Sequence, residues 1–344
     1  AGHTYRPIRQ KLPDRLIKQG IRQVSYTGCE ELGLSSLSTS DYKYLAELTD
    51  GLIEYCDSKK VSLSVPSLRA DNFSMSLMER IQRVRKSGLT FAPEAGTQHL
   101  RDVINKNLTE EEIIHACETA FAGGYGSVKL YYMLGLPTET NDDIDGIAEM
   151  ADHVVNAWRR KASNKNRGLK VTVSTSLFIP KPFTPFQWER QCSPEEMYEK
   201  IAFLRSRMTA KAVTYNYHDP RTSTLEGVFA RGDRRLCDAI ILAWKRGCKM
   251  DSWDEHFKYD VWMETFADCG IDTSFYLSSR PLDGLLPWSH INCGVTNEYL
   301  LRSRADGYAG KITPDCRVKC AGCGASKLFN GGFCDVGNSN KTDI

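Results

Sequence analysis

Short apolar runs alternate with amphipathic helical patterns along the first two-thirds of the 344-residue chain. Turn residues bound most of these runs, and apolar residues recur at helical spacing between them. Repeated alternation of strand and helix predicts parallel strands joined by right-handed crossovers. A sheet of this size curls towards a barrel, so we predict an α/β fold for this part. The runs lie at residues 31–37, 61–66, 89–92, 125–134, 169–179 and 213–217.

Helical patterns fill the intervals, and two of them start with capping boxes, Thr109 with Glu112 and Ser193 with Glu196. Beyond residue 220 the helical patterns continue without strands of comparable strength, and from Pro281 the chain is rich in Gly, Pro and Cys. We therefore predict a barrel over residues 1–219, a helical appendage over 220–285 and a Cys-rich metal-binding tail over 286–344. The predicted helices lie at residues 13–24, 44–56, 75–84, 113–121, 141–160, 194–208, 225–229, 236–244 and 257–266.

The stretch from Tyr125 to Asp143 combines a strand, a tight corner and the acidic start of a helix. Gly135 and Pro137 stop the strand, and the acidic residues that follow suit a helix N-terminus. In a parallel α/β protein such a corner is where ligands bind. The strand itself is predicted to be buried on both faces. The prediction rests on Val128, Leu130, Tyr131 and Met133.

The composition, 41% hydrophobic and 26% charged, is that of a globular protein. With 45 basic and 43 acidic residues the formal charge is +2, which gives no global electrostatic case for nucleic acid or a membrane surface. No apolar run approaches the length of a membrane span, and no apolar signal segment opens the chain. We expect a cytoplasmic protein that does not bind membranes.

Four corners rich in Ser, Gly, Pro and charged residues each follow a separate predicted strand, so a parallel barrel would bring them together at one face. They lie at residues 38–41, 93–97, 135–140 and 180–184. Glu94 is able to accept hydrogen bonds from a ligand, although a helix-capping role explains it too. Lys181, between two prolines, is suited to meet a carboxylate or phosphate, with a solvated surface lysine as the alternative.

Three segments resemble the radical S-adenosylmethionine (radical SAM) enzymes, in particular the branch in which a cobalamin-binding domain often precedes the barrel. The likeness covers about residues 1–215, and residues 286–292 resemble the tail of an uncharacterised subgroup. It implies a partial (β/α)6 TIM-like barrel that lacks its first strand. The three segments are Pro93 to Lys106, Met133 to Thr140 and Phe178 to Trp188.

By position, the resemblance implies which residues meet S-adenosylmethionine (SAM). The second-strand serines would face its methionine end, Glu94 and Gly96 its ribose and carboxylate, and the Gly135 corner its adenine through backbone groups. The implied cofactor-binding residues are Ser36, Ser38, Ser40, Glu94, Gly96, Leu134, Gly135, Leu136 and Lys181.

The resemblance also implies cofactors that this chain does not hold by itself. In the family a CxxxCxxC motif after the first strand binds a 4Fe-4S cluster, and no such motif precedes Ser38. We therefore expect a fragment that begins after this motif, with the cluster ligands and any cobalamin-binding domain upstream. Such a fragment would not cleave SAM on its own. The intact enzyme would need an electron donor such as a flavodoxin or ferredoxin.

Near the C-terminus, Cys316, Cys320 and Cys323 do have CxxxCxxC spacing, and Cys334 follows. Clustered thiols with glycines favour metal binding, and Cys293 or His290 is an alternative fourth ligand. The position is wrong for the catalytic cluster. Zinc and an auxiliary iron–sulfur cluster both remain open, because Cys-only ligation does not separate them.

Two functions remain after the hydrolase class is disfavoured for want of a paired nucleophile and base. The first is a radical SAM enzyme fragment that, when intact, forms a 5′-deoxyadenosyl radical or transfers a methyl or methylthio group to an unknown RNA, protein or other substrate. The alternative is a non-catalytic barrel with a zinc knuckle that binds RNA or a protein partner. Trp244-Lys245-Arg246 permits RNA contact, but we expect it to reflect helix packing.

Overall fold

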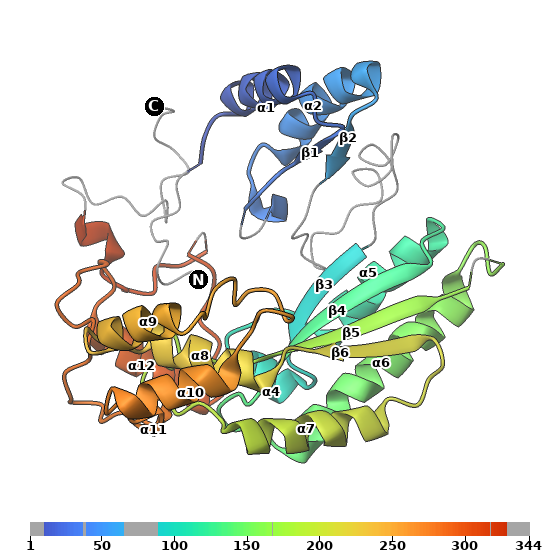
Figure 1. Ribbon diagram of the computed structural model, residues 1–344. Helices are drawn as coiled ribbons and strands as arrows, with labels where there is room; N and C mark the ends of the chain where they lie inside the picture. The colour runs from blue at the N-terminus through green and yellow to red at the C-terminus, as the bar shows by residue number, and fades with distance from the viewer. Residues whose placement is uncertain (1–9, 37–38, 65–88, 167, 317, 329–344) are drawn as a thin grey trace.

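A four-stranded parallel sheet organises the centre of the molecule. The computed structural model describes residues 10–36, 39–64, 89–166, 168–316 and 318–328. The strands are β3 (Leu89–Glu94), β4 (Ser127–Leu134), β5 (Lys170–Leu177) and β6 (Val213–Tyr217), in the order β3-β4-β5-β6 (Figure 1). Every neighbouring pair is parallel, which confirms the predicted α/β fold.

Helices connect these strands in the order expected of a βαβ chain. They are α4 (Gln98–Val103) and α5 (Glu110–Ala122) after β3, α6 (Asn141–Lys161) after β4 and α7 (Pro194–Arg207) after β5. The capping boxes predicted at Thr109 and Ser193 are confirmed, and α6 begins with a third one at Thr140. Because α4 is a single short segment of six residues, apolar periodicity did not predict it.

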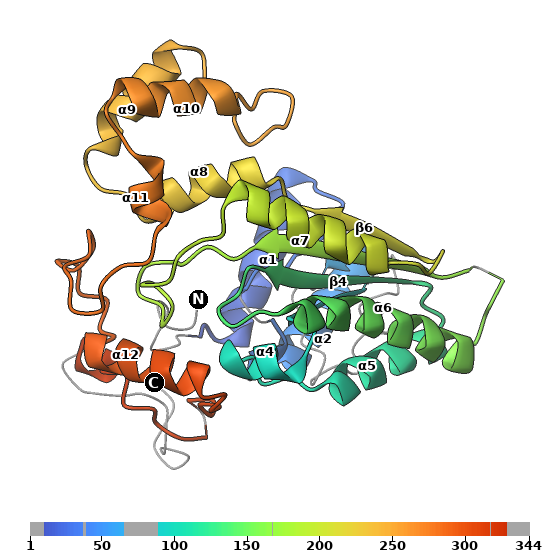
Figure 2. The ribbon, with the colours of Figure 1, turned by 90° about the horizontal axis from the view of Figure 1, so that it is seen from below.

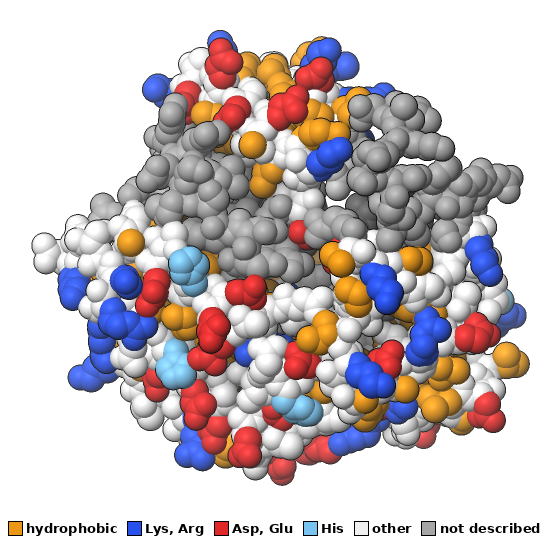
Figure 3. All heavy atoms as spheres, turned by 180° about the vertical axis from the view of Figure 1, so that it is seen from behind, with side chains coloured by type: hydrophobic (Ala, Val, Ile, Leu, Met, Phe, Trp, Pro, Cys, Tyr) orange, Lys and Arg blue, Asp and Glu red, His pale blue; other side chains and the backbone are white. Residues whose placement is uncertain are grey.

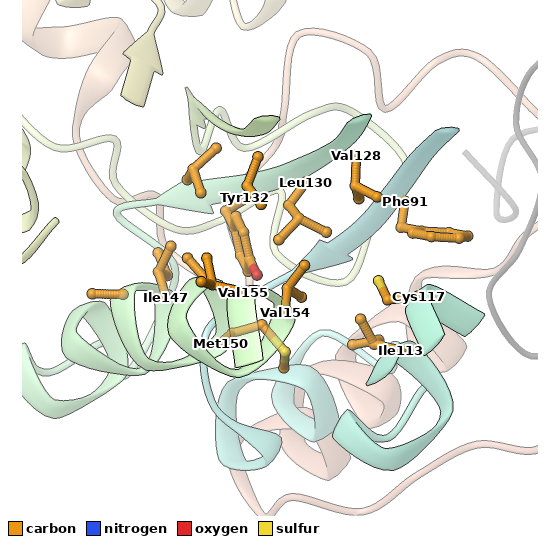
Figure 4. Packing of buried hydrophobic residues seen from close by; sticks show 14 of the residues in the cluster. Phe91, Ile113, Cys117, Val128, Leu130, Tyr132, Ile147, Met150, Val154 and Val155 are labelled. Carbon is orange, nitrogen blue, oxygen red and sulfur yellow. The ribbon is translucent and has the colours of Figure 1, made fainter. Parts of the chain in front are cut away.

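The main core lies between the sheet and these helices. In β4, Val128, Leu130, Tyr132 and Leu134 are at most 1% exposed, and Figure 4 shows the first three lying with side chains of α5 and α6. The alternate residues are different, because Lys129 is exposed and Tyr131 is 39% exposed. The prediction that β4 is buried on both faces is therefore wrong: its helix-facing side is buried, whereas on its other side Ser127, Lys129 and Tyr131 are exposed and Met133 is half-buried.

The N-terminal elements form a separate small layer. They are α1 (Pro13–Thr27), β1 (Glu31–Gly33), the 3-10 turn η1 (Thr39–Asp41), α2 (Leu45–Lys59) and β2 (Ser62–Ser64). β1 and β2 pair in parallel and have their own apolar cluster with α1 and α2. Among the described residues, β1-β2 and β3-β4-β5-β6 form two sheets, whereas we expected one continuous sheet. The helix predicted at residues 75–84 lies outside the described residues, and a partial barrel stays a prediction.

The C-terminal part contains α8 (Pro220–Ala230), α9 (Leu236–Lys245) and α10 (Tyr259–Asp268), which match the three helices predicted there. It also contains α11 (Thr273–Leu277), α12 (Asn297–Tyr308) and the 3-10 turn η3 (Ala325–Leu328), which were not predicted. Figure 2 shows α9 and α10 on the far side of α8 and α11 from the sheet. α12 was not predicted, because only three of its twelve residues are buried and its apolar pattern is weak.

Residues 186–191 follow strand β5 of the sheet and contact the C-terminal elements through hydrogen bonds and apolar packing. The Gln187 side chain is 1% exposed and accepts hydrogen bonds from the Phe183 amide and the Trp288 indole. Trp188 packs with Trp288 in an apolar cluster that also contains Cys323. The Gln191 side-chain amide donates to the carbonyl of Ser223 in α8. Gln187 and Trp188 of the motif from Phe178 to Trp188 therefore connect the sheet with the C-terminal residues.

No helix in the described ranges combines the length and the apolar character needed to cross a bilayer. On the face in Figure 3, acidic and basic side chains of the described residues are interspersed, as expected from the near-balanced charge.

Candidate functional site

Three of the four predicted corners lie at one edge of the four-stranded sheet. β3, β4 and β5 are parallel neighbours, and the register pairs Glu94 with Tyr132 and Leu134 with Leu177. The segments that follow these strand ends therefore start side by side. This edge is where ligands bind in open parallel sheets, and we take it as the candidate site.

Glu94 ends β3 in an unusual conformation. Its φ is 69°, and the pairing with β4 shifts register between Phe91 and Glu94. Such irregularities re-aim side chains and are common beside active sites. The carboxylate is 30% exposed and lies 3.3 Å from Lys106 Nζ. It remains accessible to a ligand at the sheet edge.

Gly96 is buried against α6. A Cβ at this position would lie 2.3 Å from the Asp143 carbonyl oxygen and 2.5 Å from the Ile147 nitrogen. The glycine is therefore required by the close approach of two backbones, and its expected contact with SAM is untested. Arg101, which sequence reasoning missed, is 1% exposed and donates to the carbonyls of Ala95 and Gly96 at 3.1 and 3.3 Å.

Burial lowers the pKa of Arg101. The buried guanidinium stabilises the corner after β3 through its hydrogen bonds to the backbone carbonyls of Ala95 and Gly96. The guanidinium also donates to the Gln98 side-chain oxygen at 3.2 and 3.3 Å. No sign of its burial was visible in the sequence, because its contacts with the Ala95 and Gly96 carbonyls involve backbone groups that every residue carries.

The Gly135 corner is organised by Glu139. Gly135 has φ 82°, and its amide donates to both carboxylate oxygens of Glu139 at 3.0 Å. Lys200 Nζ in α7 lies 2.8 Å from the same carboxylate, of which only 3% is exposed. Burial raises the pKa of Glu139, opposed by Lys200 and by the amides of Gly135 and Leu136.

The carbonyls of this corner are also engaged. The Leu134 carbonyl accepts from the Phe178 amide at 2.8 Å, and the Leu136 carbonyl accepts from the Glu139 amide at 3.2 Å. The Leu134 and Leu136 side chains are buried. A ligand would thus meet a turn whose conformation is already fixed by internal hydrogen bonds.

A cavity of about 630 Å³ lies beside this turn, against α7 and Tyr308 of α12. Burial raises the pKa of the Cys192 thiol that lines it. Opposite charges line it too: Arg190 donates to Glu196 at 2.7 Å and holds the pKa of that carboxyl at about 2. Glu189 accepts from Arg304 at 2.6 Å and from the Tyr308 hydroxyl at 2.9 Å, which attaches α12 to this wall.

The remaining predicted cofactor residues are less closely gathered. Lys181 is 46% exposed and pairs with Glu226 of α8. Ser36 is exposed and follows β1 in the two-stranded layer, and Ser40 lies in η1. Ser38 and the side chain of Ser40 lie outside the described residues. The structure therefore brings together the corners after β3, β4 and β5, and the role of the serines stays a prediction.

The tail cysteines are not gathered into a metal site in the part of the chain that the structure describes. Cys316 is half-buried, Cys320 is exposed and Cys323 is buried in the cluster with Trp188. No three His, Cys, Asp or Glu side chains among the described residues are placed to hold a metal ion. Cys334 lies outside these residues, so metal binding by the tail stays a prediction.

Trp244 does not pack as expected. Its side chain is 58% exposed, and Lys249 Nζ lies 5.0 Å from the ring centroid. Arg246 instead contacts α10, where it pairs with Asp268 at 2.5 Å. Helix packing as the explanation of the Trp244 position is therefore wrong.

Comparison with known proteins bears on the sequence and on the fold separately. An uncharacterized protein of Methanocaldococcus jannaschii is 31% identical over 267 residues, which cover 78% of this chain and 56% of that protein. The chain thus spans little more than half the length of this curated relative. Among solved structures, the archaeal Methanocaldococcus infernus Elp3 with an N-terminal deletion of residues 1–46 matches with a TM-score of 0.40 at 12% identity, covering 68% of this chain and 64% of that chain.

Residues 2–151, which include the corners after β3 and β4, match the model of the radical SAM superfamily. This range ends within α6, so it contains Glu94, Gly96 and the whole Gly135 turn. The chain therefore carries a radical SAM superfamily domain.

Proposed function

We propose that the carboxyl edge of β3, β4 and β5 binds SAM as part of a radical SAM enzyme. The observation that carries the proposal is the position of Glu94, an accessible carboxylate aimed by a register shift and a left-handed backbone at an edge shared with the Gly135 turn. The family match supplies the chemical class of the ligand.

The residues at this edge fit SAM in part. Glu94 is suited to accept hydrogen bonds from ribose hydroxyls, since an ionised carboxylate is a strong acceptor. The amides of Gly135 and Leu136 already donate to Glu139, so they are not free to bind adenine. Adenine would instead contact the other backbone polar groups of this turn and fit against its surface. Gly96 acts by letting the corner approach α6. Lys181 would exchange Glu226 for the carboxylate of the ligand.

In the proposed enzyme, a 4Fe-4S cluster would provide the electron that cleaves SAM to methionine and a 5′-deoxyadenosyl radical. Alternatively, SAM would supply the methyl group of a methyl or methylthio-type transfer, whose added sulfur would come from an auxiliary iron–sulfur cluster. In this sequence CxxxCxxC spacing occurs at Cys316, Cys320 and Cys323, far from the sheet edge in sequence. Binding of the 4Fe-4S cluster, an associated cobalamin-binding domain, the electron donor and the substrate class all belong to this proposal.

SAM binding by the chain, measured by equilibrium dialysis under anaerobic conditions, tests the proposal directly. We expect saturable binding that S-adenosylhomocysteine reduces by competition. A Glu94→Gln variant should bind SAM at least tenfold more weakly, because a neutral amide is a poorer acceptor. Glu118→Gln is the matched control, since Glu118 pairs with Arg160 on the helices. No binding by the unaltered chain would overturn the proposal.

The alternative, a module that binds RNA through the appendage, is favoured by one observation, the exposed Trp244 ring beside Lys249. Exposed aromatic rings beside cations provide stacking platforms for single-stranded nucleic acid. It predicts that the chain retards RNA in a gel-shift assay and that Trp244→Ala weakens this binding. If the tail binds zinc and the chain binds RNA but not SAM, the result would favour this alternative over the radical SAM proposal.

A further inference from the structure

Beyond the strand corners, α7 contributes a side chain to the Gly135 turn. Lys200 and Glu139 are 61 positions apart in sequence, yet Lys200 Nζ lies 2.8 Å from Glu139 Oε1. The lysine is itself only 24% exposed and the carboxylate 3% exposed. An ion pair this far from water is screened much less than a surface pair.

Glu139 links Lys200 to the turn, because the same carboxylate also accepts hydrogen bonds from the turn. The carboxylate accepts the Gly135 amide at 3.0 Å through each oxygen, and the Leu136 amide also contacts it. The turn lies close to α7 as well, because a Cβ on Gly135 would be 3.1 Å from Cys192 Sγ and 3.3 Å from Met197 Sδ. A helix side chain, a buried carboxylate and two backbone amides thus form one connected unit.

The other charged groups that face this unit are largely occupied elsewhere. Arg190 donates to both oxygens of Glu196, at 2.7 and 2.8 Å, and Glu189 is held by Arg304 and Tyr308. Glu199 lines the same cavity and adds negative charge. Lys200 is therefore the cation that compensates Glu139.

We infer that Lys200 is a positioning residue for SAM, which acts through Glu139 to fix the Gly135–Leu136 turn in its binding conformation. The inference rests on the proposed function of this edge. Without the cation, the buried carboxylate is left uncompensated and either takes up a proton or moves towards water, and the two amides lose their acceptor. The turn is then less ordered before SAM binds, and ordering it on binding makes the binding free energy of SAM less favourable.

A set of variants separates positioning from general stabilisation. Lys200→Met and Glu139→Gln should each weaken SAM binding about tenfold or more, and Lys200→Arg should restore most of the affinity because it keeps the cation. The double variant should bind no more weakly than Glu139→Gln alone, since both changes break one unit. Dissociation constants are measured well below each variant's unfolding temperature, which is recorded in parallel.

Arg207→Met is the matched control. Arg207 is also a basic residue of α7 that pairs with a carboxylate of α6, Asp145 at 2.8 Å, but it does not contact the turn. We expect its SAM affinity to change less than twofold. If the unaltered chain binds SAM but Lys200→Met binds equally well, or if Lys200→Arg does not recover, the inference fails and the proposed function stands. A chain that does not bind SAM at all overturns both.

Discussion

Gly96 marks the point where the backbone after β3 touches the backbone of α6. A methyl group there would meet the Asp143 carbonyl at 2.3 Å and the Ile147 nitrogen at 2.5 Å, and backbone atoms cannot rotate away. We predict that Gly96→Ala destabilises the protein by at least about 2 kcal/mol. Urea denaturation followed by circular dichroism measures this.

The control for this change is Gly33→Ala, because a Cβ at Gly33 has no neighbour within 4 Å. Its free energy of unfolding should change by no more than about 0.5 kcal/mol. A Gly96→Ala protein as stable as Gly33→Ala would mean that α6 yields at this contact.

Single residues differ in how far the sequence alone could identify them. Glu94 and Gly135 lie next to strand ends, so local pattern predicted their place at the sheet edge. Lys200 and Arg101 could not be predicted, because each acts through contacts that folding creates: Lys200 across 61 positions and Arg101 on backbone carbonyls. Lys181 was predicted as a ligand contact, but its nearest partner is Glu226.

At the scale of elements, α7 begins with a carboxylate that is bound three ways. Glu196 accepts from the Ser193 amide at 2.7 Å and from Arg190 at 2.7 and 2.8 Å, and these hydrogen bonds lower its pKa from 4.5 to about 2. A lowered folded-state pKa gives stability that is fully present above pH 4.5 and is lost as pH falls towards 2.

We therefore predict that Glu196→Gln flattens the decline of stability between pH 4.5 and pH 2. Urea midpoints measured across this range test it. The control is Glu199→Gln, which removes an exposed carboxylate of the same helix and leaves the pair between Glu196 and Arg190 in place. An equally steep decline in Glu196→Gln would contradict the prediction.

α8 and α11 are joined by one buried cation. Arg231 is 0% exposed and donates to the carbonyls of Glu189 at 2.7 Å and Ser278 at 2.9 Å. Burial and the nearby Arg280 lower its pKa to about 10, so it remains charged at neutral pH. Arg231→Met leaves these carbonyls without a donor.

We predict that Arg231→Met costs about 3 kcal/mol, from the typical loss of charged hydrogen bonds. Hydrogen exchange should show amides of α8 and α11 opening while β4 and β5 stay protected. Arg235→Met, at an exposed pair with Asp233, should cost less than about 1 kcal/mol. Uniform loss of protection across the sheet would show that the two parts unfold as one unit.

Element types were predicted best where capping and periodicity agree, as in α5, α6 and α7. α4, α11 and α12 were missed, because α4 and α11 are single short segments and α12 buries few residues. The two-sided burial expected of β4 failed for a physical reason: apolar Tyr131 and Met133 suggested cover, but they alternate with the core residues and share a face with Lys129.

On the scale of the whole molecule, the sequence predicted parallel strands followed by helices, but not that the described strands form two sheets. β1 and β2 are three residues each and pack on α1 and α2, which gives them a core of their own. Pairing between β2 and β3 depends on contacts between distant segments, which local pattern does not report. The predicted boundaries at residues 219 and 285 are likewise untested.

The tail connects to the rest through Cys323, which packs with Trp188, Trp288 and Leu300. Removing this thiol would disturb an apolar cluster as well as any metal. Cys320 is the better probe, because it is exposed and its sulfur accepts a hydrogen bond from the local Gly322 amide at 3.4 Å.

We predict that Cys320→Ser abolishes stoichiometric metal in chain purified without oxygen, because a CxxxCxxC ligand set cannot lose a thiolate and keep its affinity. Elemental analysis for zinc and iron measures this, and far-UV circular dichroism should be unchanged, since Cys320 lies outside every apolar cluster. Cys237→Ser, at an exposed thiol on α9, should retain the metal. Metal retained in Cys320→Ser would place the ligands elsewhere, whereas loss of the whole fold would mean that the tail and the sheet depend on one another for stability.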